Sequence, residues 1–182
     1  TNYNDAEIGQ KAIELLDKLG YQVLFVDHPD CGRPQLSKGM LDEAKTLAEQ
    51  NIQVFSEVID KDAPLVGIEP SAILTFRDEF IGLTRGDIQA KAKRLSKFVF
   101  TIEEYLAKEL EKGRITADQF TMDEKLIKVH GHCHQKSLSS MTPTKKILSL
   151  PQNFKVHMIP SGCCGMAGSF GYEKEHYELS MQ

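Results

Sequence analysis

The spacing of hydrophobic residues predicts a chain in which helices alternate with short strands. Apolar residues at every third or fourth position are typical of a helix that buries one face, and short continuous apolar runs are typical of a buried strand. Helical spacing predicts helices over residues 5–19, 37–59, 70–76, 87–95, 102–112, 142–150 and 173–181. The short apolar runs predict strands over residues 21–26, 65–68, 126–129 and 155–159.

Residues with strong capping preferences stand at several of the predicted helix ends. Thr101 with Glu104 has the spacing of a capping box, in which each side chain bonds the backbone N–H of the other residue. Proline suits the first turn of a helix, and glycine suits the residue just after its end. The residues expected at helix starts are Asn4 (with Glu7), Ser37, Pro70, Thr101 and Thr142, and those expected at helix stops are Gly20 and Gly113.

The alternation of helices with short apolar strands predicts an α/β fold with a mainly parallel sheet and flanking helices. A weak internal repeat accompanies it, because Asp30-Cys31-Gly32 and Cys163-Cys164-Gly165 each follow a predicted strand. We therefore expect two degenerate repeated lobes. The first covers residues 1–113 and the second covers residues 114–182, shortened at its C-terminus.

Composition and charge exclude several classes of protein. The net charge of −4 argues against nucleic acid or an anionic membrane as a partner. No apolar run approaches the roughly 18 residues of a transmembrane segment. Four cysteines are too few for a disulfide scaffold, which favours a reducing, cytoplasmic compartment and metal or redox chemistry. The opening TNYNDAE lacks the features of a signal peptide. A helix signal is already present at Asn4 and the helical pattern still runs at Gln182, so we expect a piece of a longer polypeptide.

Residues 161–171, SGCCGMAGSFG, combine two adjacent cysteines with glycine at every third position. Glycine lets the backbone approach a ligand closely and adopt a positive φ. Backbone N–H groups exposed in such a loop can hydrogen-bond to sulfur and tune a cluster. Cys163 and Cys164 are poor partners for a disulfide with each other, because that geometry is strained. The loop therefore suits a metal or an iron–sulfur cluster.

A second motif, HGHCHQK at residues 130–136, places Cys133 between His132 and His134 directly after a predicted strand. Ligands of parallel sheets gather beyond the carboxyl ends of the strands, so we expect Cys133 to converge with the cysteines of SGCCG. Three thiolates suit iron–sulfur or zinc rather than ions that prefer carboxylates. Each histidine is more often a residue that orients a loop than a metal ligand.

Four stretches of the chain carry a family resemblance: CGRPQLSKGMLDEAK, GIEPSAILTFRDEF, HGHCHQKSL and SGCCGMAGSFGYEKEHYELSM. They resemble the cysteine-rich CCG domain of iron–sulfur oxidoreductases, and most of all the C-terminal part of FAD-linked enzymes of the D-lactate dehydrogenase and glycolate oxidase type. The resemblance implies that Cys133, Cys163 and Cys164 are ligands of a 4Fe–4S-type cluster. Glu69 and the run Arg77-Asp78-Glu79, in the second stretch, are expected to pair as structural charges.

The first lobe departs from the pattern of that family. The family usually shows Cys-Cys-Gly where this chain has Asp30-Cys31-Gly32, and a cysteine where it has Ala72. Cys31 alone is more typical of a small buried residue than of a ligand, so we expect this lobe to have become structural. The later cysteine element of the second repeat would lie beyond Gln182. We therefore expect the isolated fragment to be inactive, and either free of a cluster or bound to zinc.

The sequence thus predicts the iron–sulfur electron-transfer portion of a flavin-linked 2-hydroxy-acid oxidoreductase of D-lactate or glycolate type. FAD would lie on a domain or subunit outside this chain, and electrons would pass to a carrier or quinone, in the cytoplasm or at the inner face of the membrane. Two alternatives stay open: a heterodisulfide-type thiol-redox catalytic domain, and a non-catalytic scaffold that binds zinc and docks a partner. The candidate cofactor and metal ligands are Cys133, Cys163 and Cys164, followed by His132, His134 and Cys31.

Overall fold

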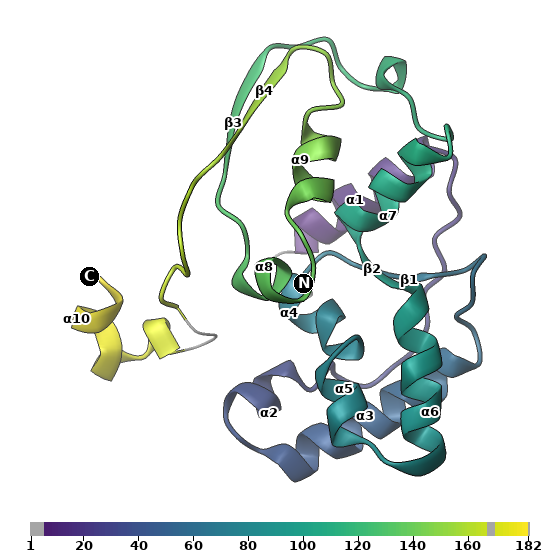
Figure 1. Ribbon diagram of the computed structural model, residues 1–182, viewed down its shortest axis with the longest axis vertical. Coiled ribbons are helices and arrows are strands. Elements are labelled where there is room, and N and C mark those ends of the chain that lie inside the picture. The colour runs from purple at the N-terminus through teal and green to yellow at the C-terminus, as the bar shows by residue number, and fades with distance from the viewer. Residues whose placement is uncertain (1–5, 167–169, 182) are drawn as a thin grey trace.

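The computed structural model describes residues 6–166 and 170–181 (Figure 1). The α-helices are α1 (Ala6–Lys18), α2 (Arg33–Ser37), α3 (Leu41–Ser56), α4 (Pro70–Ile73), α5 (Glu79–Leu83), α6 (Gly86–Leu95), α7 (Ile102–Glu111), α8 (Cys133–Leu138), α9 (Thr142–Leu148) and α10 (Tyr177–Ser180). Single 3₁₀ turns cover Leu74–Phe76, Ser96–Phe98, Ala117–Gln119, Phe170–Tyr172 and Lys174–His176. The strands are β1 (Leu65–Gly67), β2 (Val99–Thr101), β3 (Lys125–Val129) and β4 (Phe154–Met158). None of these helices has the length and apolar character needed to cross a membrane.

The strands form two small parallel sheets. β1 pairs with β2, with Leu65 opposite Val99, and β3 pairs with β4, with Lys125 opposite Phe154. Each pair is connected through helices, as parallel strands require. The predicted α/β class with parallel strands is therefore confirmed, although the strands divide between two sheets. The division of the chain at residues 113 and 114 stays a prediction.

One predicted strand is wrong and one strand was not predicted. Residues 21–26 belong to no strand, and the side chains of Leu24 and Phe25 are 66% and 78% exposed. An apolar run becomes a strand only when a neighbouring backbone pairs with it, and no described segment does so here. The unpredicted strand, β2, has three residues. Such a short run between helix signals gives no periodicity to detect.

Helix ends with a local chemical signal agree with the prediction. The Thr101 backbone N–H donates to the carboxylate of Glu104, and the Glu104 N–H donates to the Thr101 hydroxyl, at 3.0 and 3.3 Å. This capping box begins α7, which ends before Gly113 at a φ of +71°. At α4, Pro70 occupies the first turn and Glu69 accepts from the backbone as N-cap.

The predicted long helix over residues 37–59 is wrong at its start. Ser37 ends the short helix α2, and α3 begins at Leu41. Gly39 between them has a φ of +74°, a left-handed conformation that interrupts a right-handed helix. The predicted cap at Asn4 lies outside the described residues.

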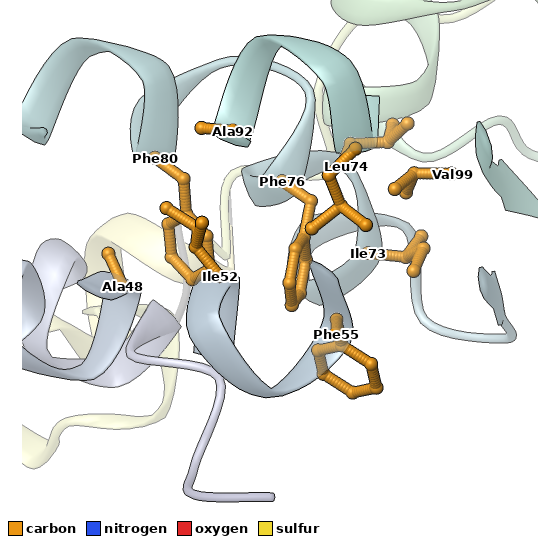
Figure 2. Close-up of a cluster of buried hydrophobic side chains, with 10 residues drawn as sticks. Ala48, Ile52, Phe55, Ile73, Leu74, Phe76, Phe80, Ala92 and Val99 are labelled. Carbon is orange, nitrogen blue, oxygen red and sulfur yellow. The ribbon is translucent and has the colours of Figure 1, made fainter. Parts of the chain in front are cut away.

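A hydrophobic core forms where α3, α4, α5 and α6 pack beside β2 (Figure 2). Phe76 stands at its centre and contacts Phe55 edge-on, with ring centroids 5.5 Å apart, and Phe80 at 4.6 Å. Such aromatic pairs add stability beyond the area that they bury. The core residues are Ala48, Ile52, Phe55, Ile73, Leu74, Phe76, Phe80, Ala92, Leu95 and Val99.

Candidate functional site

The thiol motifs lie at one edge of the β3–β4 sheet. Because the strands are parallel, their carboxyl ends share that edge, and the Ile159 N–H donates to the Val129 carbonyl at 2.8 Å just beyond the paired residues. The chain after β3 leads into α8, which begins at Cys133, and the chain after β4 leads to Cys163. Their Sγ atoms lie 3.5 Å apart. The structure therefore brings Cys133 and Cys163 into contact, and the adjacent Cys164 lies close enough to affect the pKa of both.

Lys136 fastens the two loops to each other. Its Nζ donates to the carbonyl oxygens of Ser161 and Gly162, at 2.9 and 2.8 Å. The stem of Lys136 passes close to Gly131, where an added Cβ would lie 2.8 Å from Lys136 Cε and 2.9 Å from Met141 Sδ. A side chain at residue 131 would therefore force the ends of Lys136 and Met141 to shift, and the shift of Lys136 would disturb its contact with the second loop. Sequence reasoning missed this lysine, although it stands one helical turn after Cys133.

The two thiols have opposite pKa shifts. The Gly165 N–H, 3.4 Å from Cys163 Sγ, lowers the pKa of Cys163, and the hydrogen bond with Cys133 lowers it further. The hydrogen bond with Cys163 raises the pKa of Cys133, and burial and the neighbouring Cys164 add to the rise. Cys163 is the sulfur that more readily becomes a thiolate, the form that binds metals and attacks electrophiles.

His132 and His134 shape the first loop. His132 is the N-cap of α8, and its Nδ1 accepts from the His134 N–H at 3.2 Å. Burial lowers the pKa of His132, while Glu69 opposes that shift. Glu69 Oε1 lies 3.8 Å from His132 Nε2. These contacts give His132 an orienting role, and metal ligation by either histidine stays a prediction.

Arg33, which the sequence analysis did not single out, reaches this loop from α2. Its Nη1 lies 2.5 Å from Glu79 Oε1 and 3.3 Å from His134 Nε2. The side chains of Arg33 and Glu79 are only 20% and 24% exposed, so their attraction is less screened than at an open surface. Glu79 forms the structural pair expected of it. The partner could not be predicted, because 46 residues separate the two.

A second polar contact joins the far end of α8 to α7. Arg77 Nη1 lies 2.7 Å from a carboxylate oxygen of Glu104, and its Nη2 donates to the Leu138 carbonyl at 3.4 Å. The Ser139 hydroxyl donates to the same Glu104 carboxylate. Burial acts to raise the pKa of Glu104, but the hydrogen bonds from Ser139 and Arg77 outweigh it, so this pKa lies below its usual value.

Cys31 stands apart from the thiol pair. It is half-buried in the loop before α2, where the Asp30 carbonyl accepts from Asn51 Nδ2 at 2.9 Å. Within the described residues, no hydrogen bond links Cys31 to another cysteine. Ala72 donates its N–H to Glu69 at the start of α4. The expected structural role of this lobe stays a prediction.

The cysteine thiols are the type of ligand that an iron–sulfur or zinc centre uses, but fewer of them are placed together than such a centre needs. In residues 6–166 and 170–181, no three His, Cys, Asp or Glu side chains are placed so that they could hold one metal ion. Cys133 and Cys163 are in contact, and Cys164 is close enough to influence the pKa of both. Two thiolates on one tetrahedral ion with ~2.3 Å bonds lie about 3.8 Å apart. The observed 3.5 Å suits such a shared ion with little adjustment.

Comparison with known proteins supports the family resemblance. Residues 1–74 match the family model of the cysteine-rich domain CCG. The whole chain is 29% identical to D-2-hydroxyglutarate dehydrogenase of Pantoea ananatis over 185 residues. Over 98% of its length it is 26% identical to one of the subunits of anaerobic glycerol-3-phosphate dehydrogenase from Escherichia coli K12. Over 90% it is 28% identical to lactate utilization protein A 1 of Bacillus mycoides. No solved structure matches the chain.

The aligned regions include nearly all of this chain but only part of each relative. The chain spans 17% of the Pantoea dehydrogenase, 44% of the Escherichia coli protein and 66% of the Bacillus protein. The family match falls on the lobe that retains only Cys31, whereas the thiol pair lies in the part aligned with the dehydrogenases. The resemblance to a CCG-domain oxidoreductase is thereby confirmed.

Proposed function

We propose that this chain is the iron–sulfur, electron-transfer portion of a flavin-linked oxidoreductase that acts on a 2-hydroxy acid. The observation that carries the proposal is the meeting of the two loops that bear Cys133 and Cys163 at one edge of a parallel sheet. Similarity along the whole chain to proteins named as dehydrogenases gives this thiol site an oxidoreductase context. Two of the relatives' names contain a 2-hydroxy acid, D-2-hydroxyglutarate or lactate, which supports the substrate class.

In this proposal Cys133, Cys163 and Cys164 hold the cluster, and a fourth ligand comes from outside the three. A bound iron–sulfur cluster supplies a one-electron carrier. The chain's own residues prepare the site. Lys136 holds the loop that bears Cys163, and the Gly165 N–H donates to the Cys163 sulfur. Hydrogen bonds of this kind stabilise negative charge on sulfur and raise the potential of a centre.

The proposed partners are a flavin-bearing domain or subunit and an electron acceptor, either a soluble carrier or a quinone. The relatives are longer than this chain, which leaves room for a flavin site elsewhere in such a protein. A cytoplasmic location, with peripheral attachment at the inner face of the membrane for a quinone acceptor, belongs to the same proposal.

One observation favours a different centre, a zinc ion in a non-catalytic scaffold. The 3.5 Å between the sulfurs is near the value for two thiolates on one tetrahedral ion. The thiolates of a cluster bind different irons and therefore stand farther apart. Metal and sulfide analysis separates the two functions, because a zinc site contains no inorganic sulfide.

The test is iron, zinc and acid-labile sulfide analysis of the full-length protein after anaerobic purification. We expect the protein to contain iron and sulfide and to absorb at about 400 nm. The Cys133→Ser variant should lose the iron, the sulfide and this absorption. Cys31→Ser is the matched control and should retain both. Zinc without sulfide would overturn the proposal in favour of the scaffold. We expect the 182-residue chain alone to hold no cluster or to hold zinc, because it offers three clustered thiols where a cluster takes about four.

A further inference from the structure

The contact between Cys133 and Cys163 also suits chemistry that needs no metal. The two Sγ atoms are 3.5 Å apart, and both thiols are free. A disulfide bond is about 2.05 Å long, so closure requires about 1.5 Å of travel. Cys163 can supply that movement, because it is exposed and its loop is open: a Cβ added at Gly162 or Gly165 would meet nothing within 4 Å.

The other pairings are less favourable. A disulfide between the adjacent residues Cys163 and Cys164 would be strained. Cys133 makes its sulfur hydrogen bond with Cys163. Cys31 is half-buried in another loop. The geometry thus selects one pair among the four cysteines.

We propose that Cys133 and Cys163 form a reversible disulfide in the metal-free chain, by exchange with a low-molecular-weight disulfide such as oxidised glutathione. The Cys163 sulfur attacks one glutathione sulfur, forms a mixed disulfide and releases one reduced glutathione. The Cys133 sulfur then attacks Cys163, forms the internal bond and releases the second glutathione. Two protein thiols are oxidised, one small disulfide is reduced, and the two protons pass to the released thiols.

This inference goes beyond the proposed function, because it holds for a site that takes either a cluster or zinc. The internal bond would remove two of the three clustered thiols from metal binding and leave Cys164 free. Oxidation and metal loading would then exclude each other. Lys136 favours closure, since it holds the carbonyls of Ser161 and Gly162 and so keeps the Cys163 loop beside α8.

The experiment uses the 182-residue chain, reduced, stripped of metal with a chelator and equilibrated anaerobically with oxidised glutathione. After alkylation of the remaining thiols, digestion and mass spectrometry locate the bonds. We expect about two of the four thiols to disappear into one internal disulfide that joins the Cys133 and Cys163 peptides. Cys31→Ser and Cys164→Ser are the matched controls and should form the same bond. Cys133→Ser and Cys163→Ser should carry only mixed disulfides with glutathione.

An internal bond that forms mainly between Cys133 and Cys164, or mixed disulfides alone in the unmodified chain, would overturn the inference. Circular dichroism of each variant before oxidation shows whether it is folded. If Cys163→Ser does not fold, the Cys164→Ser result decides, because that variant keeps the proposed pair. Failure here would leave the proposed function untouched, since that function is tested by bound iron and sulfide. Absence of iron and sulfide would likewise leave this disulfide test unaffected.

Discussion

The helical region from α3 to α7 and the thiol region from β3 to the loop after β4 are stabilised in different ways. The buried hydrophobic residues of the described chain lie between Ala44 and Ile115, within and just after the helical region. In the thiol region the buried side chains are those of Gln135 and Thr144, which share a 2.9 Å hydrogen bond, and of Pro151. Its strand residue Leu126 is 64% exposed. One region therefore has a packed core, and the other depends on specific polar contacts.

The thiol region is held in place by contacts with residues that lie outside it. Arg33, in α2, and Glu104, in α7, both lie outside the thiol region, and they contact His134 and Ser139 at the two ends of α8. Figure 1 shows α8 beside α4, between the β3–β4 strands and the helical region. Hydrogen bonds to charged groups are worth about 1.5–3 kcal/mol each, less than a large buried aromatic side chain. A core mutation should therefore lower the stability of the whole molecule, whereas a mutation at these contacts should mainly loosen the thiol region.

The largest effect is expected for Phe80→Ala. Phe80 is fully buried, so its truncation leaves a cavity and should lower the free energy of unfolding by about 3–5 kcal/mol. Leu126→Ala, the matched change in the thiol region, should alter it by no more than about 0.5 kcal/mol, because that side chain is exposed. Urea unfolding followed by circular dichroism measures both. Equal losses would show that the thiol region has a hydrophobic core of its own.

A smaller, pH-dependent effect is expected for Glu104→Gln. The pKa of Glu104 is lowered in the folded state, so its carboxylate stabilises the protein above the unfolded-state pKa of about 4.3. That contribution is lost as the pH falls through the lower, folded-state value. The variant should lose about 1–3 kcal/mol at pH 7 and show a shallower decline in stability between about pH 5 and pH 3.

Unfolding free energies across this pH range are the measurement. Glu103→Gln, on the same helix, is the control and should keep the pH profile of the unmodified chain. The comparison between the regions would fail if Glu104→Gln left both stability and pH profile unchanged. The contact of Glu104 with Arg77 and Ser139 would then do nothing to hold α8 in place.

Features encoded by neighbouring residues could be predicted from the sequence. The capping box of Thr101 and Glu104 and the stop at Gly113 need only a few consecutive residues. The approach of Cys133 to Cys163 was also predictable, because parallel strands bring their carboxyl ends to one edge.

Features that depend on distant partners could not be predicted. Residues 21–26 have the composition of a strand, but strand formation needs a paired neighbour that composition does not reveal. The contact of Arg33 with Glu79 and His134 joins three parts of the chain that share no motif. Sequence patterns identified the thiols, whereas the partners of the charged residues around them could be assigned only from the folded chain.

The central proposal is that the loop containing Cys163 lies on an electron path, while the first lobe has a structural role only. The most direct test is a paired assay on the full-length protein: anaerobic flavin bleaching by the hydroxy acid, then turnover with an electron acceptor. In Cys163→Ser we expect the hydroxy acid to reduce the flavin normally but turnover with the acceptor to be lost. Cys31→Ser should retain both flavin reduction and turnover. Normal turnover in Cys163→Ser would contradict the account. So would a Cys31→Ser variant that folds and whose flavin is reduced normally, but that loses turnover as severely as Cys163→Ser.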